Sequence, residues 1–152
     1  MNIRTLLSLL IFFLLVGATA WTATQFEPGS WYQSLEKPSW TPPDELFAPV
    51  WSVLYICIAL AGWLVWRDSG GEISFPLMLW AIQLALNGIW SWVFFGMQEM
   101  LAGLVIISVL LGVILIFFFR SRNRAASLLF LPYALWIAYA TMLNLEIVRF
   151  NP

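Results

Sequence analysis

Five long apolar runs, separated by polar joints, constrain this chain more than any other feature of its sequence. A transmembrane helix needs about 20 mostly apolar residues, because a helix satisfies its own backbone hydrogen bonds in lipid. We therefore predict an all-α fold, with one integral membrane bundle of five transmembrane helices over residues 1–152. The predicted spans are approximately residues 3–26, 46–66, 73–98, 100–119 and 125–145, and residues 27–45 form the one long connection.

Composition agrees with this fold and removes several classes of function. Hydrophobic residues make up 62% of the chain and charged residues 10%, whereas a soluble domain has roughly 45–50% apolar and about 25% charged residues. The net charge of −1 provides no basic surface for nucleic acid. Because the chain has no histidine and one cysteine, Cys57, we expect no Cys/His metal site, no intrachain disulfide and no required cofactor.

The first apolar run admits a second interpretation. Arg4, the apolar core of residues 6–17 and the small residues 18–20 are also typical of a cleavable signal peptide. Apolar residues continue through Trp21 to Phe26, past the point where such a peptide would be cut. We therefore keep this run as a span, and loss of about twenty residues from the mature protein would contradict that choice.

Basic residues predict the orientation, because they are retained on the cytoplasmic side of a membrane. With five spans, one side carries Arg4, Arg67, Arg120, Arg122 and Arg124, and the other carries Lys37 and Arg149. In a bacterial inner membrane the N-terminus is therefore predicted to be cytoplasmic and the long connection external.

Helical phase identifies faces on the second, third and fifth spans where aromatic residues lie beside polar or small ones. Positions three, four and seven apart share a helical face. The aligned sets are Trp51, Tyr55, Ile58 and Gly62; Gln83, Asn87, Trp90 and Phe94; and Tyr133, Trp136, Ala140 and Asn144. Because lipid offers an amide no partner, we expect Gln83, Asn87 and Asn144 to point inward. The converging aromatic residues then either line a small-molecule pocket or simply fill the bundle.

Two further patterns have ordinary explanations. Ala81, Ala85 and Gly88 form a stripe of small residues that permits either self-association or packing against another helix of the same chain. The tryptophans interpreted as anchors at the membrane interface are Trp21, Trp63, Trp66 and Trp80.

Four ordered segments carry a family resemblance. They are WYQSLEKPSWTPP (31–43), FAPVWSVLY (47–55), QLALNGIWSWVFFG (83–96) and LPYALWIAYATMLN (131–144). Over nearly its whole length the sequence resembles the translocator protein (TspO/MBR) family, which includes the tryptophan-rich sensory proteins of bacteria and the mitochondrial peripheral benzodiazepine receptor.

The resemblance implies a homodimer, for which Ala81, Ala85 and Gly88 are the predicted interface, and a pocket closed by the first loop. In the family this pocket takes porphyrins, above all protoporphyrin IX, as well as isoquinoline and benzodiazepine drugs and, in animal members, cholesterol. The resemblance and the helical faces together predict a ligand site. Its residues are Ala48, Trp51, Tyr55, Asn87, Trp90, Phe94, Trp136, Ala140 and Leu143. Leu145 and Glu146 stand where the cholesterol motif requires tyrosine, so we do not expect that motif to bind sterol.

The resemblance also implies two candidate activities. The first is porphyrin binding for tetrapyrrole sensing, scavenging or transport, although the predicted second to fifth spans contain no charge to act as an ion relay. The alternative is light- and oxygen-dependent degradation of protoporphyrin, reported for some bacterial relatives. Trp51 and Trp136 are its candidate catalytic residues, because indole is oxidisable.

The long connection is interpreted as a lid over this pocket. Its predicted lid residues are Trp31, Leu35, Pro38, Trp40 and Pro43. Prolines restrict the backbone, so a loop that contains them loses less entropy when it becomes ordered. Asp44, just before the second span, is predicted to cap that helix.

Overall fold

The computed structural model describes residues 3–26 and 28–152. Its elements are α1 (Ile3–Thr24), α2 (Ser30–Ser34), the 3-10 helix η1 (Asp44–Leu46), α3 (Phe47–Asp68), α4 (Phe75–Ser91), the π-helix η2 (Trp92–Gly96), α5 (Met100–Arg120) and α6 (Arg124–Phe150). Throughout the described residues all regular structure is helical, and five of the helices are long and apolar enough to cross a membrane. The prediction of an all-α bundle of five membrane-spanning helices is confirmed.

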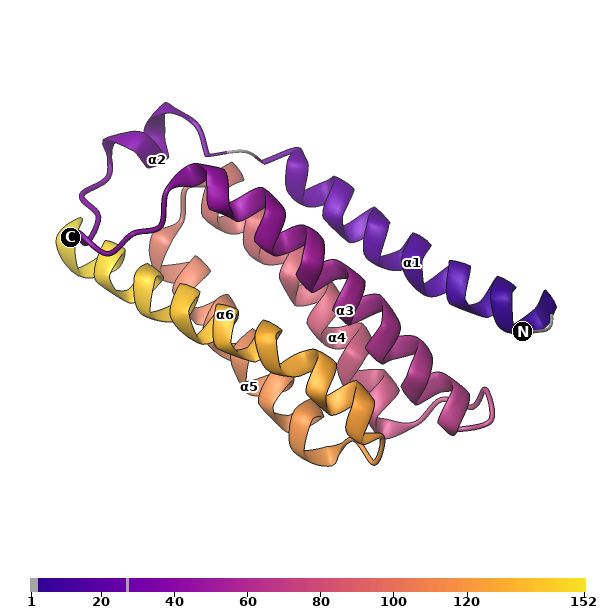
Figure 1. The fold of residues 1–152 in the computed structure, drawn as a ribbon. Coiled ribbons are helices and arrows are strands. Elements are labelled where there is room, and N and C mark those ends of the chain that lie inside the picture. The colour runs from indigo at the N-terminus through magenta and orange to yellow at the C-terminus, as the bar shows by residue number, and fades with distance from the viewer. Residues whose placement is uncertain (1–2, 27) are drawn as a thin grey trace.

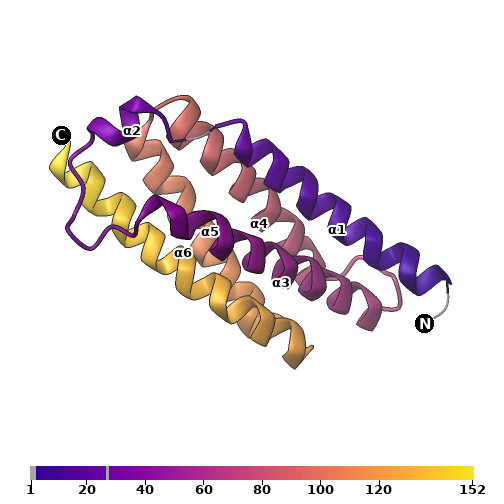
Figure 2. The same ribbon diagram turned by 45° about the horizontal axis from the view of Figure 1, so that its top comes forward.

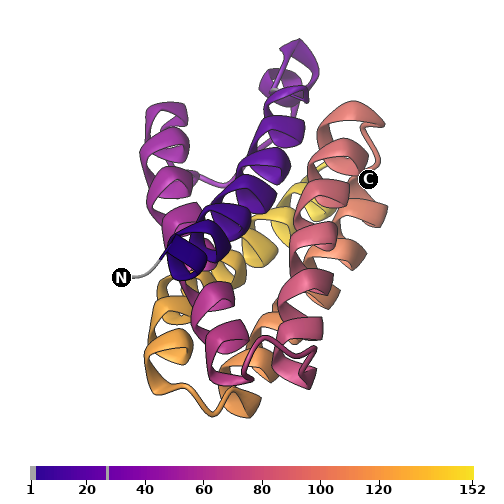
Figure 3. The same cartoon turned by 90° about the vertical axis from the view of Figure 1, so that its right-hand side faces the viewer.

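The five long helices run up and down, but they are not arranged in chain order around a centre. Helix α6 packs against both α3 and α5, and α5 in turn packs against α4. The first helix, α1, contacts α3 and α4 and lies over the gap between them (Figure 3). The four helices α3 to α6 therefore form the body of the bundle, with α1 attached to one side.

Connections at the two ends of the bundle differ in kind. The start of α1 and the short turns 69–74 and 121–123 lie at one end, which we call the arginine end (Figure 1). The long connection between α1 and α3 lies at the other end, beside the C-terminus, which we call the loop end (Figure 2). The separation of Arg67, Arg120 and Arg122 from Lys37 agrees with the predicted sides, while the compartment that each side faces stays a prediction.

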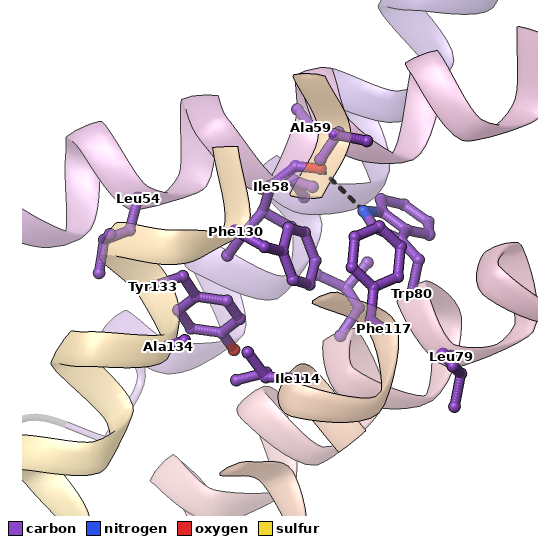
Figure 4. Packing of buried hydrophobic residues seen from close by; sticks show 14 of the residues in the cluster. Leu54, Ile58, Ala59, Leu79, Trp80, Ile114, Phe117, Phe130, Tyr133 and Ala134 are labelled. Carbon is purple, nitrogen blue, oxygen red and sulfur yellow. Dashed lines mark hydrogen bonds between the residues drawn. The ribbon is translucent and has the colours of Figure 1, made fainter. Parts of the chain in front are cut away.

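The core of the bundle is built around interlocking aromatic rings. Phe117 stacks on Phe130 with ring centroids 4.0 Å apart, and Tyr133 meets Phe130 edge to face at 5.7 Å. The Trp80 indole nitrogen donates a 2.8 Å hydrogen bond to the carbonyl oxygen of Ile58 (Figure 4). This side chain occupies the space that Gly62 leaves open, because a Cβ on Gly62 would overlap the indole.

Two tryptophans assigned to the membrane interface are buried instead. Trp80 is 3% exposed, and Trp63 donates a hydrogen bond of 3.1 Å to the hydroxyl of Ser8 on α1. The interfacial interpretation was wrong for both, because position near the end of a span does not reveal which helix faces the side chain. Trp21, at 65% exposed, does face outward.

Three helix ends at the loop end differ from expectation. The third span changes from α to π geometry at Trp92, and Gln98, with a φ of 61°, begins the sharp turn into α5. Asp44 does not cap α3, because residues 44–46 form a separate 3-10 turn and no side chain caps either helix start. Helix α6 continues to Phe150, past the predicted end at residue 145.

Candidate functional site

A small enclosed cavity lies toward the loop end, between α3, α4, α5 and α6. Its volume is about 50 Å³. The residues that line it are Phe47, Trp51, Asn87, Trp90, Ile107, Leu110, Trp136, Ile137 and Ala140. Five of the predicted ligand residues, Trp51, Asn87, Trp90, Trp136 and Ala140, therefore meet around one space.

Buried amides hold the helices together beside this cavity. The Tyr55 hydroxyl donates to Asn87 Oδ1 at 3.3 Å, and Asn87 Nδ2 donates to the Tyr133 hydroxyl at 2.9 Å. On the next turn the Trp90 indole donates to Asn144 Oδ1 at 3.4 Å. Asn87 and Asn144 point inward as predicted, and their bonds connect α3, α4 and α6 where aliphatic side chains could not.

Gln83 also points inward but lacks the partner that we expected. It is fully buried, one turn before Asn87, and neither its amide nitrogen nor its amide oxygen has a hydrogen-bond partner among the described residues. Such an unpaired buried amide costs roughly 1–3 kcal/mol in protein mutational data. The amide of Gln83 therefore remains available for hydrogen bonds inside the bundle.

The cavity walls are aromatic on two sides. Trp51 lies 5.2 Å from the Tyr55 ring and meets Tyr133 edge to face at 6.2 Å. Trp136 of α6 meets Phe47 of α3 edge to face at 5.8 Å. Phe47 was not predicted, although it lies one helical turn before Trp51 and so shares its face.

Helix α5 contributes Ile107 and Leu110 to the cavity, and neither was predicted. Apart from Ser108, which is exposed, and Arg120 at its end, the helix is apolar on all sides, so no polar residue marks an inward face. Only its packing against α4 and α6 identifies these two residues.

The long connection folds back over a second apolar cluster next to the cavity. Trp31 meets Phe94 edge to face at 5.7 Å, and Tyr32 is buried among Phe94, Leu143 and Ile147. Burial raises the pKa of Tyr32 to about 12, with the charge of Asp44 acting in the same direction. Tyr32 was missed as a lid residue because the neighbouring tryptophan is the more conspicuous one.

Lys37 fastens the turn that follows α2. Its ammonium group donates to the carbonyl oxygens of Tyr32 at 2.6 Å and Leu35 at 3.3 Å, and it lies 4.6 Å from the centroid of the Tyr32 ring. The only cation of the long connection thus closes its own loop instead of pointing freely into solvent.

Two contacts join the connection to α6. The Tyr139 hydroxyl donates to the carbonyl oxygen of Trp40 at 2.6 Å, and the two rings meet edge to face at 5.4 Å. Asn151 accepts from the Glu36 backbone N–H at 3.0 Å and donates to the Glu36 carbonyl at 2.9 Å. These two contacts, which we call the lid latches, hold the connection across the loop end.

The remaining predicted ligand residues lie outside the cavity lining. Phe94 and Leu143 are buried in the cluster under Tyr32, Tyr55 lies behind Trp51, and Ala48 is exposed. They form the surroundings of the cavity and its cover.

The predicted lid residues divide in a similar way. Trp31 and Leu35 are half-buried and Pro38 is buried, so these three cover the bundle. Trp40, at 42% exposed, and Pro43 lie on the outer surface of the connection.

The stripe of small residues on α4 is split by the fold. Ala81 and Ala85 are exposed. A Cβ on Gly88 would lie 3.6 Å from Thr22 Oγ1 on α1, so this glycine faces a neighbouring helix of the same chain.

The arrangement suits a flat, largely apolar ligand that also accepts or donates a few hydrogen bonds. Small-molecule pockets usually measure roughly 300–1,000 Å³. The cavity, at about 50 Å³, is therefore too small in this conformation to hold such a ligand. A ligand of macrocycle size requires movement of Trp51, Trp136 or the lid.

The model of the TspO/MBR family matches residues 8–149. A tryptophan-rich protein TspO of Chlorobaculum tepidum is 46% identical, over 91% of this chain and 90% of the relative. A tryptophan-rich protein TspO of Archaeoglobus fulgidus is 38% identical over 99% of both chains. The human translocator protein is 38% identical, over 80% of this chain and 75% of its own length.

Proposed function

This chain belongs to the TspO/MBR family of multi-pass integral membrane proteins, and on that premise we propose that it binds porphyrins such as protoporphyrin IX in the cavity between α3, α4, α5 and α6. The observation that carries the proposal is the convergence of Trp51, Trp90 and Trp136 with Asn87 around one space. Stacked or edge-on aromatic contacts add about 0.5–1.5 kcal/mol each beyond the burial of area.

Polarity along the bundle supports one orientation of the ligand. The cavity lies near the loop end, beneath the long connection and its charged residues, while the core toward the arginine end is mostly apolar apart from Gln83. The two propionates of a porphyrin would therefore face the lid and water, and the macrocycle would lie between Trp51 and Trp136. Binding of this kind suits tetrapyrrole sensing, scavenging or transport.

Titration of the purified protein with protoporphyrin IX in the dark tests the proposal. Saturable quenching of tryptophan fluorescence is expected, because several tryptophans would lie against the ligand. The variant Trp21→Phe serves as a control, since Trp21 is exposed on the far side of the bundle on α1. Quenching that rises linearly with porphyrin and never saturates would contradict a defined site.

A second candidate function is favoured by the position of Trp51 and Trp136 in the cavity lining itself. In this function an excited porphyrin takes one electron from an indole, which leaves an indole radical cation and a porphyrin radical anion. Dioxygen then takes that electron from the porphyrin radical anion as superoxide. Superoxide adds to the macrocycle, and the surplus electron of the adduct returns to the indole radical cation, so that the net change is the addition of one dioxygen to the porphyrin. This activity predicts that porphyrin absorbance is lost only when light and oxygen are both present and the porphyrin is bound to the protein. Simple binding predicts no such loss.

Self-association is a third proposal, and it concerns α4. Ala81 and Ala85 are exposed and lie one turn apart, so a second bundle can approach the backbone closely there. We place the homodimer contact on these two alanines and leave out Gly88, which faces α1. Ala85→Trp should abolish the dimer in cross-linking experiments without loss of helicity, and an unchanged dimer would exclude this face.

A further inference from the structure

A second and larger hollow lies at the arginine end, where α3 ends, α4 begins and α5 turns into α6. Its volume is about 590 Å³. One part of its lining is polar, with Arg120, Arg122, Ser74 and Asn123, and another part is apolar, with Phe75 and Phe119. We call this hollow the arginine groove, and it lies at the opposite end of the bundle from the cavity.

The two arginines of the groove have no carboxylate partner among the described residues. The ion pair that the described chain forms is Arg149 with Glu146, at the loop end. The Arg120 guanidinium lies 5.6 Å from the centroid of the Phe75 ring, so it extends from α5 toward α4 across the groove. A guanidinium presents several donors in a plane and matches the oxygens of a phosphate group.

Asp68 is the acidic residue in the lining, and it is already engaged. Its Oδ2 accepts a hydrogen bond from Asn123 Nδ2, while Asn123 Oδ1 accepts from the backbone N–H of Ala126 and so caps α6. With one carboxylate against two guanidinium groups, the groove keeps a net positive charge. The Asn123 bridge also fixes the α5–α6 turn that carries Arg122.

The start of α4 adds two polar features to the same wall. Ser74 Oγ is buried and has no hydrogen-bond partner in the described chain. Ser74 precedes α4 without capping it, so the N–H groups of Phe75 and Leu77 have no partner within the helix, while Pro76 between them has no N–H. A helix N-terminus with free N–H groups favours an anion.

The apolar part of the groove indicates what kind of anion fits. Phe119 is 76% exposed and Phe75 is 51% exposed, and both flank the arginines where the membrane spans end. A free phosphate would leave these rings unused, whereas a lipid places its phosphate and its acyl chains next to each other. Basic pockets between transmembrane helices are known to receive anionic headgroups.

We propose that the arginine groove binds an anionic phospholipid, with its phosphate at Arg120, Arg122 and Ser74 and its acyl chains along Phe75 and Phe119. The site does not depend on the porphyrin proposal, because it shares no residue with the cavity. It would tie the arginine end to a leaflet rich in anionic lipid.

Native mass spectrometry of the full chain tests this proposal in mixed micelles that contain phosphatidylglycerol and phosphatidylcholine with identical acyl chains. Preferential retention of phosphatidylglycerol is expected. Arg120→Gln and Arg122→Gln should each weaken that retention about fivefold, which is the typical effect of one basic residue near a lipid surface. Ser74→Leu, which fills the groove without a change of charge, should lower retention as well.

Arg124→Gln is the matched control, since Arg124 lies at the same end and carries the same charge but does not line the groove. It should retain phosphatidylglycerol as the unmodified chain does, and circular dichroism should show equal helicity for all variants. An equal loss of phosphatidylglycerol retention in Arg124→Gln would overturn the proposal. It would mean that the overall positive charge of the arginine end, not the groove, attracts the lipid. Displacement of the lipid by inorganic phosphate would also overturn it, in favour of a free anion.

Discussion

Asn87 on α4 donates a hydrogen bond of 2.9 Å from its side-chain nitrogen to the hydroxyl of Tyr133 on α6. Both side chains are buried, and the carbonyl oxygen of the same amide accepts from Tyr55 on α3. One amide therefore connects three helices beside the cavity. Its removal would affect both the stability of the bundle and the shape of the proposed site.

We first predict that Asn87→Leu lowers stability by about 1–3 kcal/mol, because it leaves the buried Tyr133 hydroxyl and the half-buried Tyr55 hydroxyl without their partner. The measurement is the midpoint of thermal unfolding in detergent. Ser108→Ala serves as the control, because Ser108 is exposed and bonds only to the carbonyl oxygen of Leu104 in its own helix. Equal midpoints for Asn87→Leu and the unmodified chain would show that the network does not stabilise the bundle.

Gly62→Ala is predicted to destabilise the core by about 1–3 kcal/mol, the usual effect of overpacking. The added methyl group would overlap the Trp80 indole and disturb its hydrogen bond to Ile58. Gly112→Ala is the matched change, since no atom lies within 4 Å of a Cβ there. Near-ultraviolet circular dichroism should show loss of tryptophan asymmetry in the first variant only.

The lid latches are expected to control the rate of ligand entry. Asn151→Ala removes both hydrogen bonds to Glu36, and Tyr139→Phe removes the bond to Trp40. Because the cavity is closed in the latched form, both variants should raise the association rate of protoporphyrin IX in stopped-flow quenching. Gln33 is exposed on the same connection, so Gln33→Ala should leave the association rate unchanged. Rates that are identical in all variants would mean that the ligand enters elsewhere.

Trp51 and Trp31 should differ in their effect on porphyrin affinity. Trp51 lines the cavity, whereas Trp31 packs on Phe94 in the cover. Trp51→Ala is therefore expected to weaken binding roughly tenfold or more, and Trp31→Ala clearly less. Equilibrium titration in the dark measures both, and equal losses would contradict the division between cavity and cover.

Photo-oxidation, if the protein carries it out, should depend on the cavity indoles. The double variant Trp51→Phe and Trp136→Phe keeps aromatic side chains at both positions but removes two of the three indoles in the cavity lining, with Trp90 as the third. Porphyrin absorbance under light and oxygen should then decline more slowly at equal occupancy. Decay at the unmodified rate would exclude Trp51 and Trp136 as the electron donors.

Much of the site followed from helical phase, because phase is a local property. The amides Asn87 and Asn144 point inward since lipid cannot satisfy them, and Trp51, Trp90 and Trp136 share their faces. The same reasoning did not reach Ile107 and Leu110, because the polar residues of α5, Ser108 and the terminal Arg120, do not mark an inward face. It placed Gln83 inside correctly but did not foresee that its amide would lack a partner, since the partner of an amide depends on a different helix.

The sequence by itself determined five membrane-spanning helices, their approximate ends and the inward direction of the polar side chains, because length and phase within one helix express the mismatch between amides and lipid. Only the tertiary structure decided that Trp80 fills the space beside Gly62, that Gly88 faces α1, and that the lid latches hold the long connection across the loop end. These outcomes depend on which side chains from distant segments meet in a close-packed interior, where a single methyl group changes what fits.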